Sequence, residues 1–222
     1  SENHPPVFFE PASNLEPEEE NDDIDTSYTY ITQEVLGKTY LLHLKSVFED
    51  SHDAAEPEVY ETGKDLNETY QLVEPEGKGS ILVNLSGYAQ TTLASDGIST
   101  MNILSPLKVL LDFNDYQYLH PCLGNITLTG KMECHLTGVV NNKTKNTAIS
   151  GGCTSGTSID QENIIVSTGN SQYLVRFKLH VNQSGDPFDQ DSYNFSGKFT
   201  INGIELNAQT LLEQDISCKD AK

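Results

Sequence analysis

The chain has 222 residues, of which 33 are acidic and 13 basic, and its formal net charge is −20. This length suits one all-β domain or two small ones. Because Arg176 is the single arginine, the forked donor that dominates phosphate and base recognition is nearly missing, which excludes nucleic acid as a partner. No run of 18 apolar residues occurs and the first residues lack the parts of a signal peptide, so we expect a soluble, processed chain without a transmembrane segment.

The negative charge is concentrated in two segments. Residues 1–25 contain nine acids, four prolines and neither Lys nor Arg, which predicts a disordered acidic tether; a docking arm for a basic partner is the alternative. Residues 49–76 contain ten acids against Lys64 alone and lie between two strand-like runs, so we expect a long acidic loop. Residues 26–222 as a whole are expected to form a single β domain.

Apolar residues recur at every second position along most of the remaining chain, which is the pattern of half-buried strands. In chain order the predicted strands lie at 28–31, 40–45, 81–86, 109–113, 126–128, 164–166, 174–181 and 199–204. Polar or glycine-bearing turns are expected at 95–99, 141–146, 169–171 and Asn202–Gly203. Residues 206–214 are the best candidate for a short helix, and they also fit the flanks of a final strand.

A pattern of polar, apolar, hydroxyl and glycine residues occurs four times. The copies end at Gly87, Gly130, Gly138 and Gly197. Each copy predicts a strand that ends or bulges at its glycine, and the unequal spacing between copies excludes a solenoid. We therefore expect an all-β fold, an antiparallel β-sandwich or open β-barrel of roughly eight to twelve short strands.

Four cysteines lie in the β region, and none belongs to a CxxC motif of a zinc or redox site. The segment between Cys134 and Cys153 has the pattern of a hairpin, with a polar turn at its midpoint, which favours a disulfide between them. Cys122 and Cys218 then pair by elimination. Two disulfides indicate an oxidising compartment, so we expect a secreted, periplasmic or cell-surface protein, with four reduced thiols in a cytosolic protein as the alternative.

Six N-glycosylation sequons begin at Asn67, Asn84, Asn125, Asn142, Asn182 and Asn194. Two of them, Asn84 and Asn194, belong to the recurring glycine pattern. This overlap favours ordinary polar composition at strand edges, as in a bacterial envelope protein, over glycosylation in a eukaryotic one.

Candidate metal ligands are few. The acidic turn with Asp186, Asp189 and Asp191 offers oxygen ligands for calcium, and a second acidic cluster lies at 49–53. No histidine shows metalloenzyme spacing. No other cofactor is expected.

These features predict a non-enzymatic binding or structural module whose partner is a protein or another cell-surface component, a glycan or lipid included. Without Trp, the largest aromatic platform for a sugar ring is absent. The first alternative is a carrier of a small apolar ligand or lipid inside a β-barrel or sandwich. The second is a hydrolase with the strand-borne carboxylates Asp112, Asp115 and Glu133.

Overall fold

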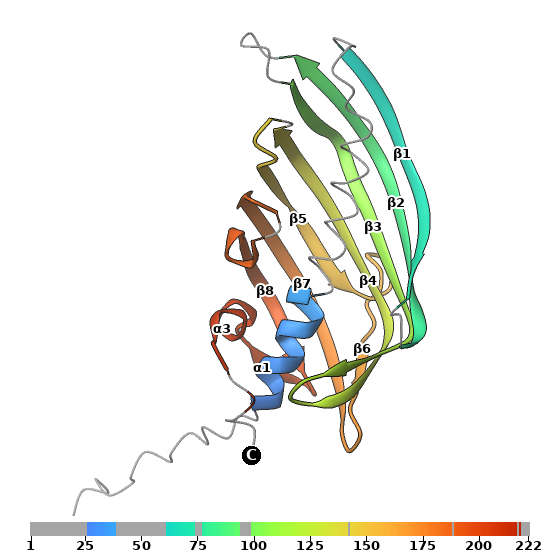
Figure 1. The fold of residues 1–222 in the computed structure, drawn as a ribbon, viewed down its shortest axis with the longest axis vertical. Helices are drawn as coiled ribbons and strands as arrows, with labels where there is room; N and C mark the ends of the chain where they lie inside the picture. Colours follow the sequence, from blue (N-terminus) through green and yellow to red (C-terminus); the bar gives the residue numbers. More distant parts are fainter. Residues whose placement is uncertain are drawn as a thin grey trace, which may run out of the picture.

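A single curved antiparallel sheet of nine strands forms the body of the computed structural model, which describes residues 26–38, 61–73, 77–93, 99–141, 143–187, 189–216 and 218 (Figure 1). The strands are β1 (Glu61–Leu72), β2 (Lys78–Leu93), β3 (Ser99–His120), β4 (Gly124–Asn141), β5 (Thr147–Ser155), β6 (Ile164–Ser167), β7 (Gln172–Gly185), β8 (Tyr193–Ile201) and β9 (Ile204–Leu206). Their order is β1-β2-β3-β4-β5-β7-β8-β9, and β6 pairs with both β4 and β7. The predicted all-β antiparallel fold is therefore confirmed.

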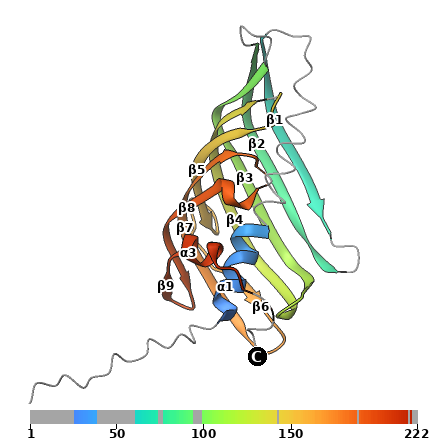
Figure 2. The ribbon, with the colours of Figure 1, turned by 60° about the vertical axis from the view of Figure 1, so that its left-hand side comes forward.

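The sheet curves around three short helical segments, which define its inner face (Figures 1 and 2). These segments are α1 (Thr26–Thr32), the π-helix η1 (Gln33–Lys38) and α3 (Ala208–Glu213), and a 3-10 turn, η2 (Gln190–Ser192), lies before β8. Buried apolar side chains from α1, η1, α3 and the inner face form one core cluster. Among the described residues no helix is long and apolar enough to cross a membrane.

The period-two pattern determines which side chains face the core. Along β7, residues are alternately exposed and buried from Gln172 to Gln183, and β4, β5 and β8 alternate in the same way over parts of their length. Burying one face of such a strand fixes its register, because a slip of one residue would turn every apolar side chain outward. The turns predicted at 141–146, 169–171 and Asn202–Gly203 all connect strands of this sheet.

The prediction of a strand at 28–31 is wrong, because these residues form helix α1. Tyr30 and Ile31 recur at helical spacing with Val35 and Leu36, and all four side chains are buried. The short apolar pattern at 28–31 is compatible with a strand or with a helix. Packing against the inner face of the sheet stabilises the helix. Tyr28 and Tyr30 contact the rings of Tyr173 and His120 at centroid distances of 5.9 and 5.4 Å.

The short helix predicted near the C-terminal end is confirmed as α3, with β9 directly before it. Asn207 caps its N-terminus, where the side chain accepts a hydrogen bond from the Thr210 backbone N–H. Helix α3 is tied to the N-terminal helix by Gln33, whose Nε2 donates to the backbone carbonyls of Leu211 and Gln214.

The prediction of an acidic loop at 49–76 is wrong for Glu61–Leu72, which form strand β1 at the edge of the sheet. Tyr70 and Leu72 pack against the core, two residues apart, as a strand requires. Charged residues are tolerated there because edge strands commonly carry them. The tether predicted at 1–25, the strand at 40–45 and residues 49–60 lie outside the described residues.

The glycines of the recurring pattern lie where neighbouring strands approach closely. A Cβ atom at Gly138 would lie 2.1 Å from the Ala148 carbonyl oxygen, and one at Gly197 would lie 2.5 Å from that of Lys178. Gly197 also has a φ of +122°, which disfavours other residues. The pairing of β3 with β4 shifts register between Ile103, opposite Gly138, and Leu107. Glycine therefore permits the close strand contacts of the curved sheet.

The cysteines lie in the two pairs expected from the sequence. Cys134 and Cys153 are direct cross-strand partners in β4 and β5, with Cα atoms 4.1 Å apart. Cys122 and Cys218 are joined across a sequence separation of 96, with Cα atoms 4.9 Å apart. Two disulfides are typical of proteins from oxidising compartments.

Candidate functional site

Cations gather on the outer face of the sheet, opposite the helices. Although the chain carries a net charge of −20, strands β5, β7 and β8 contain no Asp or Glu, and they carry Arg176, Lys178 and Lys198. These three side chains are exposed; Arg176 and Lys178 have buried neighbours on both sides, and Lys198 precedes the buried Phe199. We call the basic face the set of outer-face residues Lys108, His135, Arg176, Lys178, His180 and Lys198.

The strand register brings these residues together from four strands. Lys178 of β7 is the direct cross-strand partner of Lys198 of β8. Lys108 of β3 lies opposite His135 of β4. His135 and His180 both pair with Gly152 of β5, so a position without a side chain separates the two imidazoles. The basic face is therefore a product of sheet order and not of any sequence motif.

Among the described residues, Lys178 and Lys198 have no anionic partner. Within the described part of the chain no carboxylate lies at ion-pair distance from either ammonium group or from Arg176. Like charges placed directly opposite each other on a sheet are destabilising. A lysine pair that no described carboxylate neutralises is therefore a feature that an anionic ligand would stabilise.

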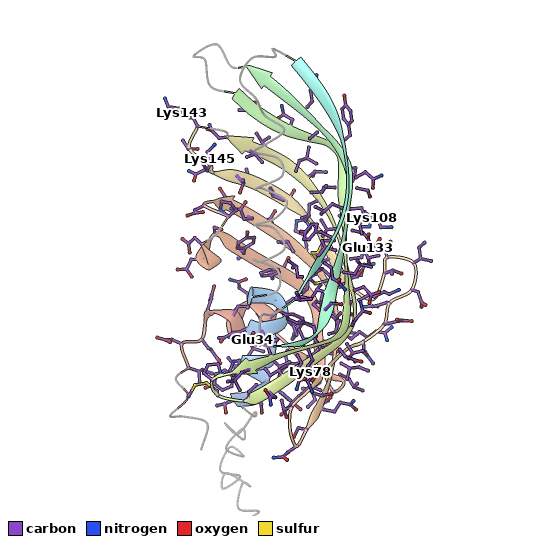
Figure 3. All side chains as sticks on the ribbon, turned by 45° about the vertical axis from the view of Figure 1, so that its right-hand side comes forward. Glu34, Lys78, Lys108, Glu133, Lys143 and Lys145 are labelled. Carbon is purple, nitrogen blue, oxygen red and sulfur yellow. A yellow bond between two sulfur atoms is a disulfide. The ribbon has the colours of Figure 1, made fainter. Side chains whose placement is uncertain are left out.

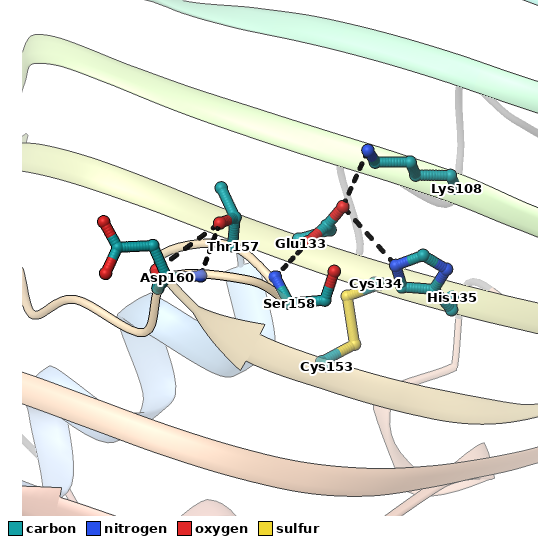
Figure 4. Close-up of polar contacts among 8 residues, drawn as sticks. All are labelled: Lys108, Glu133, Cys134, His135, Cys153, Thr157, Ser158 and Asp160. Atoms are coloured by element: carbon teal, nitrogen blue, oxygen red, sulfur yellow. Dashed lines mark hydrogen bonds and ion pairs between the residues drawn. A yellow bond between two sulfur atoms is a disulfide. The ribbon is translucent and has the colours of Figure 1, made fainter.

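Glu133 is the buried carboxylate beside the basic face, and its side chain is 1% exposed. Its Oε1 atom lies 2.9 Å from Lys108 Nζ and 3.4 Å from His135 Nε2 (Figures 3 and 4). The backbone N–H of Ser158 donates to its Oε2 atom. Through this bond Glu133 holds the connection between β5 and β6 against the sheet.

Burial by itself raises the pKa of Glu133, but the hydrogen bonds from Ser158 and Lys108 outweigh burial and lower the pKa from 4.5 to about 2. The carboxylate is therefore ionised at neutral pH and neutralises Lys108. A general acid or base needs a pKa near the working pH, so this environment suits a structural anion. Next to it lies the buried Oγ1 atom of Thr154, which stands between Glu133 and Lys178 in the register and has no hydrogen-bond partner among the described residues.

A shallow hollow of about 380 Å³ adjoins the basic face on the same side of the sheet. Its outer-face side chains are uncharged and polar, apart from Ala148, and come from Ser150 of β5, Asn182 and Ser184 of β7 and Asn194 of β8. Ser150 pairs with Asn182, which pairs with Asn194, so the three form one row across the sheet. We call this feature the polar hollow after these polar side chains, and the larger part of its lining surface is apolar.

A second polar cluster lies on the inner face, at the junction of η1 with β3, where Figure 3 places Glu34. The Tyr118 hydroxyl donates to Glu34 Oε2 at 2.7 Å, and His120 Nε2 lies 3.1 Å from Glu34 Oε1. His120 Nδ1 accepts the backbone N–H groups of Cys122 and Leu123, both at 3.0 Å. Both imidazole nitrogens are thus engaged, Nε2 carries the proton, and the cluster holds the helix on the sheet.

The carboxylates expected in a hydrolase do not form a free acid–base pair. Asp115 accepts a hydrogen bond from the Thr129 hydroxyl at 2.7 Å. Asp112 lies opposite Lys131 in the register of β3 and β4, and Glu133 is engaged as described.

The calcium ligands predicted at Asp186, Asp189 and Asp191 lie in the connection between β7 and β8. There Asp189 Oδ1 accepts the backbone N–H of Asp191. Within the described ranges no three His, Cys, Asp or Glu side chains form a group that could hold a metal ion. The second predicted acidic cluster, at 49–53, lies outside those ranges.

Five of the six sequon asparagines belong to described strands, and all five occupy outer-face positions: Asn67, Asn84, Asn125, Asn182 and Asn194. Asn142 lies outside the described residues.

Sequence reasoning missed the basic face, although β7 contained a signal for it. Arg176, Lys178 and His180 alternate with apolar residues, which places all three on one side of a strand. That Lys178 lies two strands away from His135, and that Lys198 lies on the next strand beside Lys178, follows only from strand order.

Comparisons with protein-family models, curated proteins and solved structures found no match for this chain. The fold and the site define an open antiparallel β domain with two disulfides and a cationic outer face.

Proposed function

We propose that the chain is a non-enzymatic binding module of an oxidising compartment, secreted, periplasmic or on the cell surface, and that it binds an anionic partner through the basic face. The observation that carries this proposal is the exposed pair Lys178–Lys198, which has no counter-ion within the described residues. An anion between the two ammonium groups removes their mutual repulsion and gains charge-assisted hydrogen bonds.

The local charge supports this choice of partner despite the acidity of the chain. At physiological salt, exposed charges more than about 8 Å apart are largely screened from each other. Strands β5, β7 and β8 contribute cations only, and the nearby Glu133 is neutralised by Lys108. An anion that approaches these three strands therefore meets no carboxylate of their own, and the nearest exposed acids among the described residues belong to the β5–β6 connection (Asp160, Glu162) and to β9 (Glu205).

A non-enzymatic role is supported by the contacts of the acid–base groups. Glu133, Asp115 and His120 are each engaged in hydrogen bonds that tie one part of the fold to another. The two disulfides support an extracytoplasmic location, because they persist under oxidising conditions.

A carrier of a small apolar ligand is the second candidate. In Figures 1 and 2 helices α1 and α3 lie over the lower part of the inner face. Buried apolar side chains continue along the sheet to Ala89, Ile103 and Val140. A ligand of stoichiometric mass, found by native mass spectrometry of protein from its natural source and lost on denaturation, would favour the carrier.

The experiment that tests the binding module uses two immobilised polyanions, poly-L-glutamate and dextran sulfate, and compares the native chain with a Lys178→Ala/Lys198→Ala variant. We expect the native chain to bind at least one polyanion, with an affinity that falls as salt rises. The double variant should bind at least about tenfold more weakly.

The matched control is Lys143→Ala, which removes an exposed cation from the turn between β4 and β5. This variant should bind like the native chain. Absence of binding to both polyanions, or equal weakening by the control, would overturn the proposal. Thermal unfolding of each variant verifies that it is folded.

A further inference from the structure

We infer that the partner of the basic face is an anionic saccharide, whose charged group binds Lys178 and Lys198 and whose hydroxyl groups bind in the polar hollow. This inference rests on the proposed function and specifies the chemical class of its ligand. The charged group is an oxyanion carried on a sugar ring, a sulfate, phosphate or carboxylate.

The first support is the continuity of the two features. Along β7, Lys178, His180 and Asn182 follow one another on the outer face, and their partners on β8 are Lys198, Ser196 and Asn194. Four residues of strand span about 13 Å, which exceeds one sugar ring. The surface from the lysine pair to the asparagine pair therefore fits an oligosaccharide that lies along the strands.

The second support is the chemistry of the polar hollow. An asparagine side chain both donates and accepts hydrogen bonds, as a sugar hydroxyl group does. Asn182 and Asn194 are exposed, and within the described residues their side chains make no hydrogen bond to the protein. An extended acidic peptide would satisfy the lysines but would offer few hydroxyl groups to this row of amides and serines.

The third support is the surface between the charged and uncharged ends. Gly152 lies in the same row as His180 and Ser196 and leaves open space above β5, since a Cβ atom there would have one neighbour at 3.7 Å. A ring can rest over this position without meeting a side chain. The exposed imidazole of His180 adds a further polar group beside it.

Recognition of this kind depends on charge and hydrogen bonds and not on aromatic stacking. The chain has no Trp, and the described β5, β7 and β8 carry no aromatic residue on their outer face. Tyr173, Phe177 and Phe199 all point into the core. We therefore expect binding to require the charged group, and to be weak for a neutral sugar polymer.

The test compares three immobilised probes at one ionic strength: dextran sulfate, uncharged dextran and poly-L-glutamate. We expect dextran sulfate to bind at least about tenfold more tightly than poly-L-glutamate, and uncharged dextran to bind least. An Asn182→Ala/Asn194→Ala variant should lose about tenfold in affinity for dextran sulfate, with its affinity for poly-L-glutamate unchanged.

The matched control is Asn125→Ala, which removes an exposed outer-face amide at the start of β4. It should leave all affinities unchanged. Equal binding of both polyanions, with no effect of the asparagine variant, would overturn the saccharide and leave the proposed function intact. Loss of all polyanion binding would overturn both. If the asparagine variant still preferred dextran sulfate, the sugar would not bind in the polar hollow, and this part of the inference would be overturned.

The saccharide could be a small free molecule or part of a surface polymer, since both share this chemistry. A competition experiment distinguishes them. Soluble sulfated disaccharide should displace the chain from immobilised dextran sulfate if one or two sugars fill the site. A requirement for long sulfated chains would contradict a site of this size and would indicate diffuse attraction to a polyanion surface.

Discussion

Lys178 lies directly opposite Lys198 on the outer face of β7 and β8, with no carboxylate of the described residues at ion-pair distance. A like-charged cross-strand pair costs a few tenths to about 1 kcal/mol relative to a neutral pair. A bound anion would offset this cost, because it would remove the repulsion between the two ammonium groups. The repulsion in the ligand-free chain therefore adds to the free energy gained on binding.

The first prediction separates stability from binding at this pair. Lys198→Glu converts the repulsive pair into an attractive one, so the ligand-free variant should unfold at a higher temperature, with a gain of up to about 1 kcal/mol. The same variant should lose binding to dextran sulfate. Thermal unfolding and binding are measured on one preparation, and Lys143→Glu serves as the control, with neither effect. A variant that loses stability would contradict the repulsive pair.

The second prediction concerns the pH dependence that Glu133 imparts. Its pKa is about 2 in the folded chain and 4.5 ordinarily, so it contributes stability above pH 4.5 that is lost as the pH falls towards 2. The shift corresponds to up to about 3 kcal/mol. Glu133→Gln should be less stable than the native chain at pH 7, and the difference should shrink as the pH falls towards 2.

Denaturant unfolding measured from pH 7 to pH 2 checks this dependence. A constant difference between the two proteins across that range would mean that the ion pair with Lys108 contributes nothing pH-dependent. Lys108→Met supplies a second variant, which should raise the pKa of Glu133 and move the loss of stability to higher pH.

Part of this fold was predictable because strand patterns are local. Alternation along 174–181 marks β7 without knowledge of its neighbours, and the polar turn midway between Cys134 and Cys153 predicts that hairpin and its disulfide. Helix α1 was not predictable in the same way. Its buried residues pack on a sheet whose strands lie much further along the sequence, so the local pattern does not determine its structure.

The basic face was less predictable than the fold. Lys108, Lys178 and Lys198 are far apart in sequence. They share the outer face only because β4 and β5 connect β3 to β7 in the sheet and β8 follows β7. The role of Glu133 was likewise hidden, since a sequence does not show that Lys108 and the Ser158 backbone surround it. Strand order is the missing information in both cases.

The third prediction tests the recurring glycine pattern. Gly138→Ala would place a Cβ atom 2.1 Å from the Ala148 carbonyl oxygen, so β4 and β5 must separate. We expect a loss of stability of about 2 kcal/mol or more. Gly169→Ala is the control, since a Cβ atom there has nothing within 4 Å. Equal unfolding temperatures for the two variants would show that the close approach at Gly138 relaxes freely.

The fourth prediction concerns the disulfide that joins the C-terminal segment to the sheet. Removing the bond between Cys122 and Cys218 with serines releases a constraint over 96 residues of sequence, which corresponds to about 4 to 5 kcal/mol in the entropy model. Removing the Cys134–Cys153 bond, with a separation of 19, should cost about 3 kcal/mol. Unfolding in denaturant measures both, and the reverse order would contradict the loop-length account.

The fifth prediction concerns the sequons at the polar hollow. Asn182 and Asn194 are direct cross-strand partners, so a glycan on either would cover the hollow. We expect both to be unmodified in protein from its natural source. Peptide mass spectrometry decides this, and a glycan at either position at high occupancy would rule out the hollow as a binding site.

The central claim is that the outer face of β5, β7 and β8 binds an anionic saccharide. The most direct measurement is NMR chemical-shift mapping of the isotope-labelled chain during titration with a sulfated oligosaccharide. We predict saturable shifts at the backbone amides of Lys178, His180, Asn182, Asn194 and Lys198, with little change at the inner-face cluster around Glu34. Shifts that are absent, or that centre on the inner face or the turn at 141–146, would contradict the account.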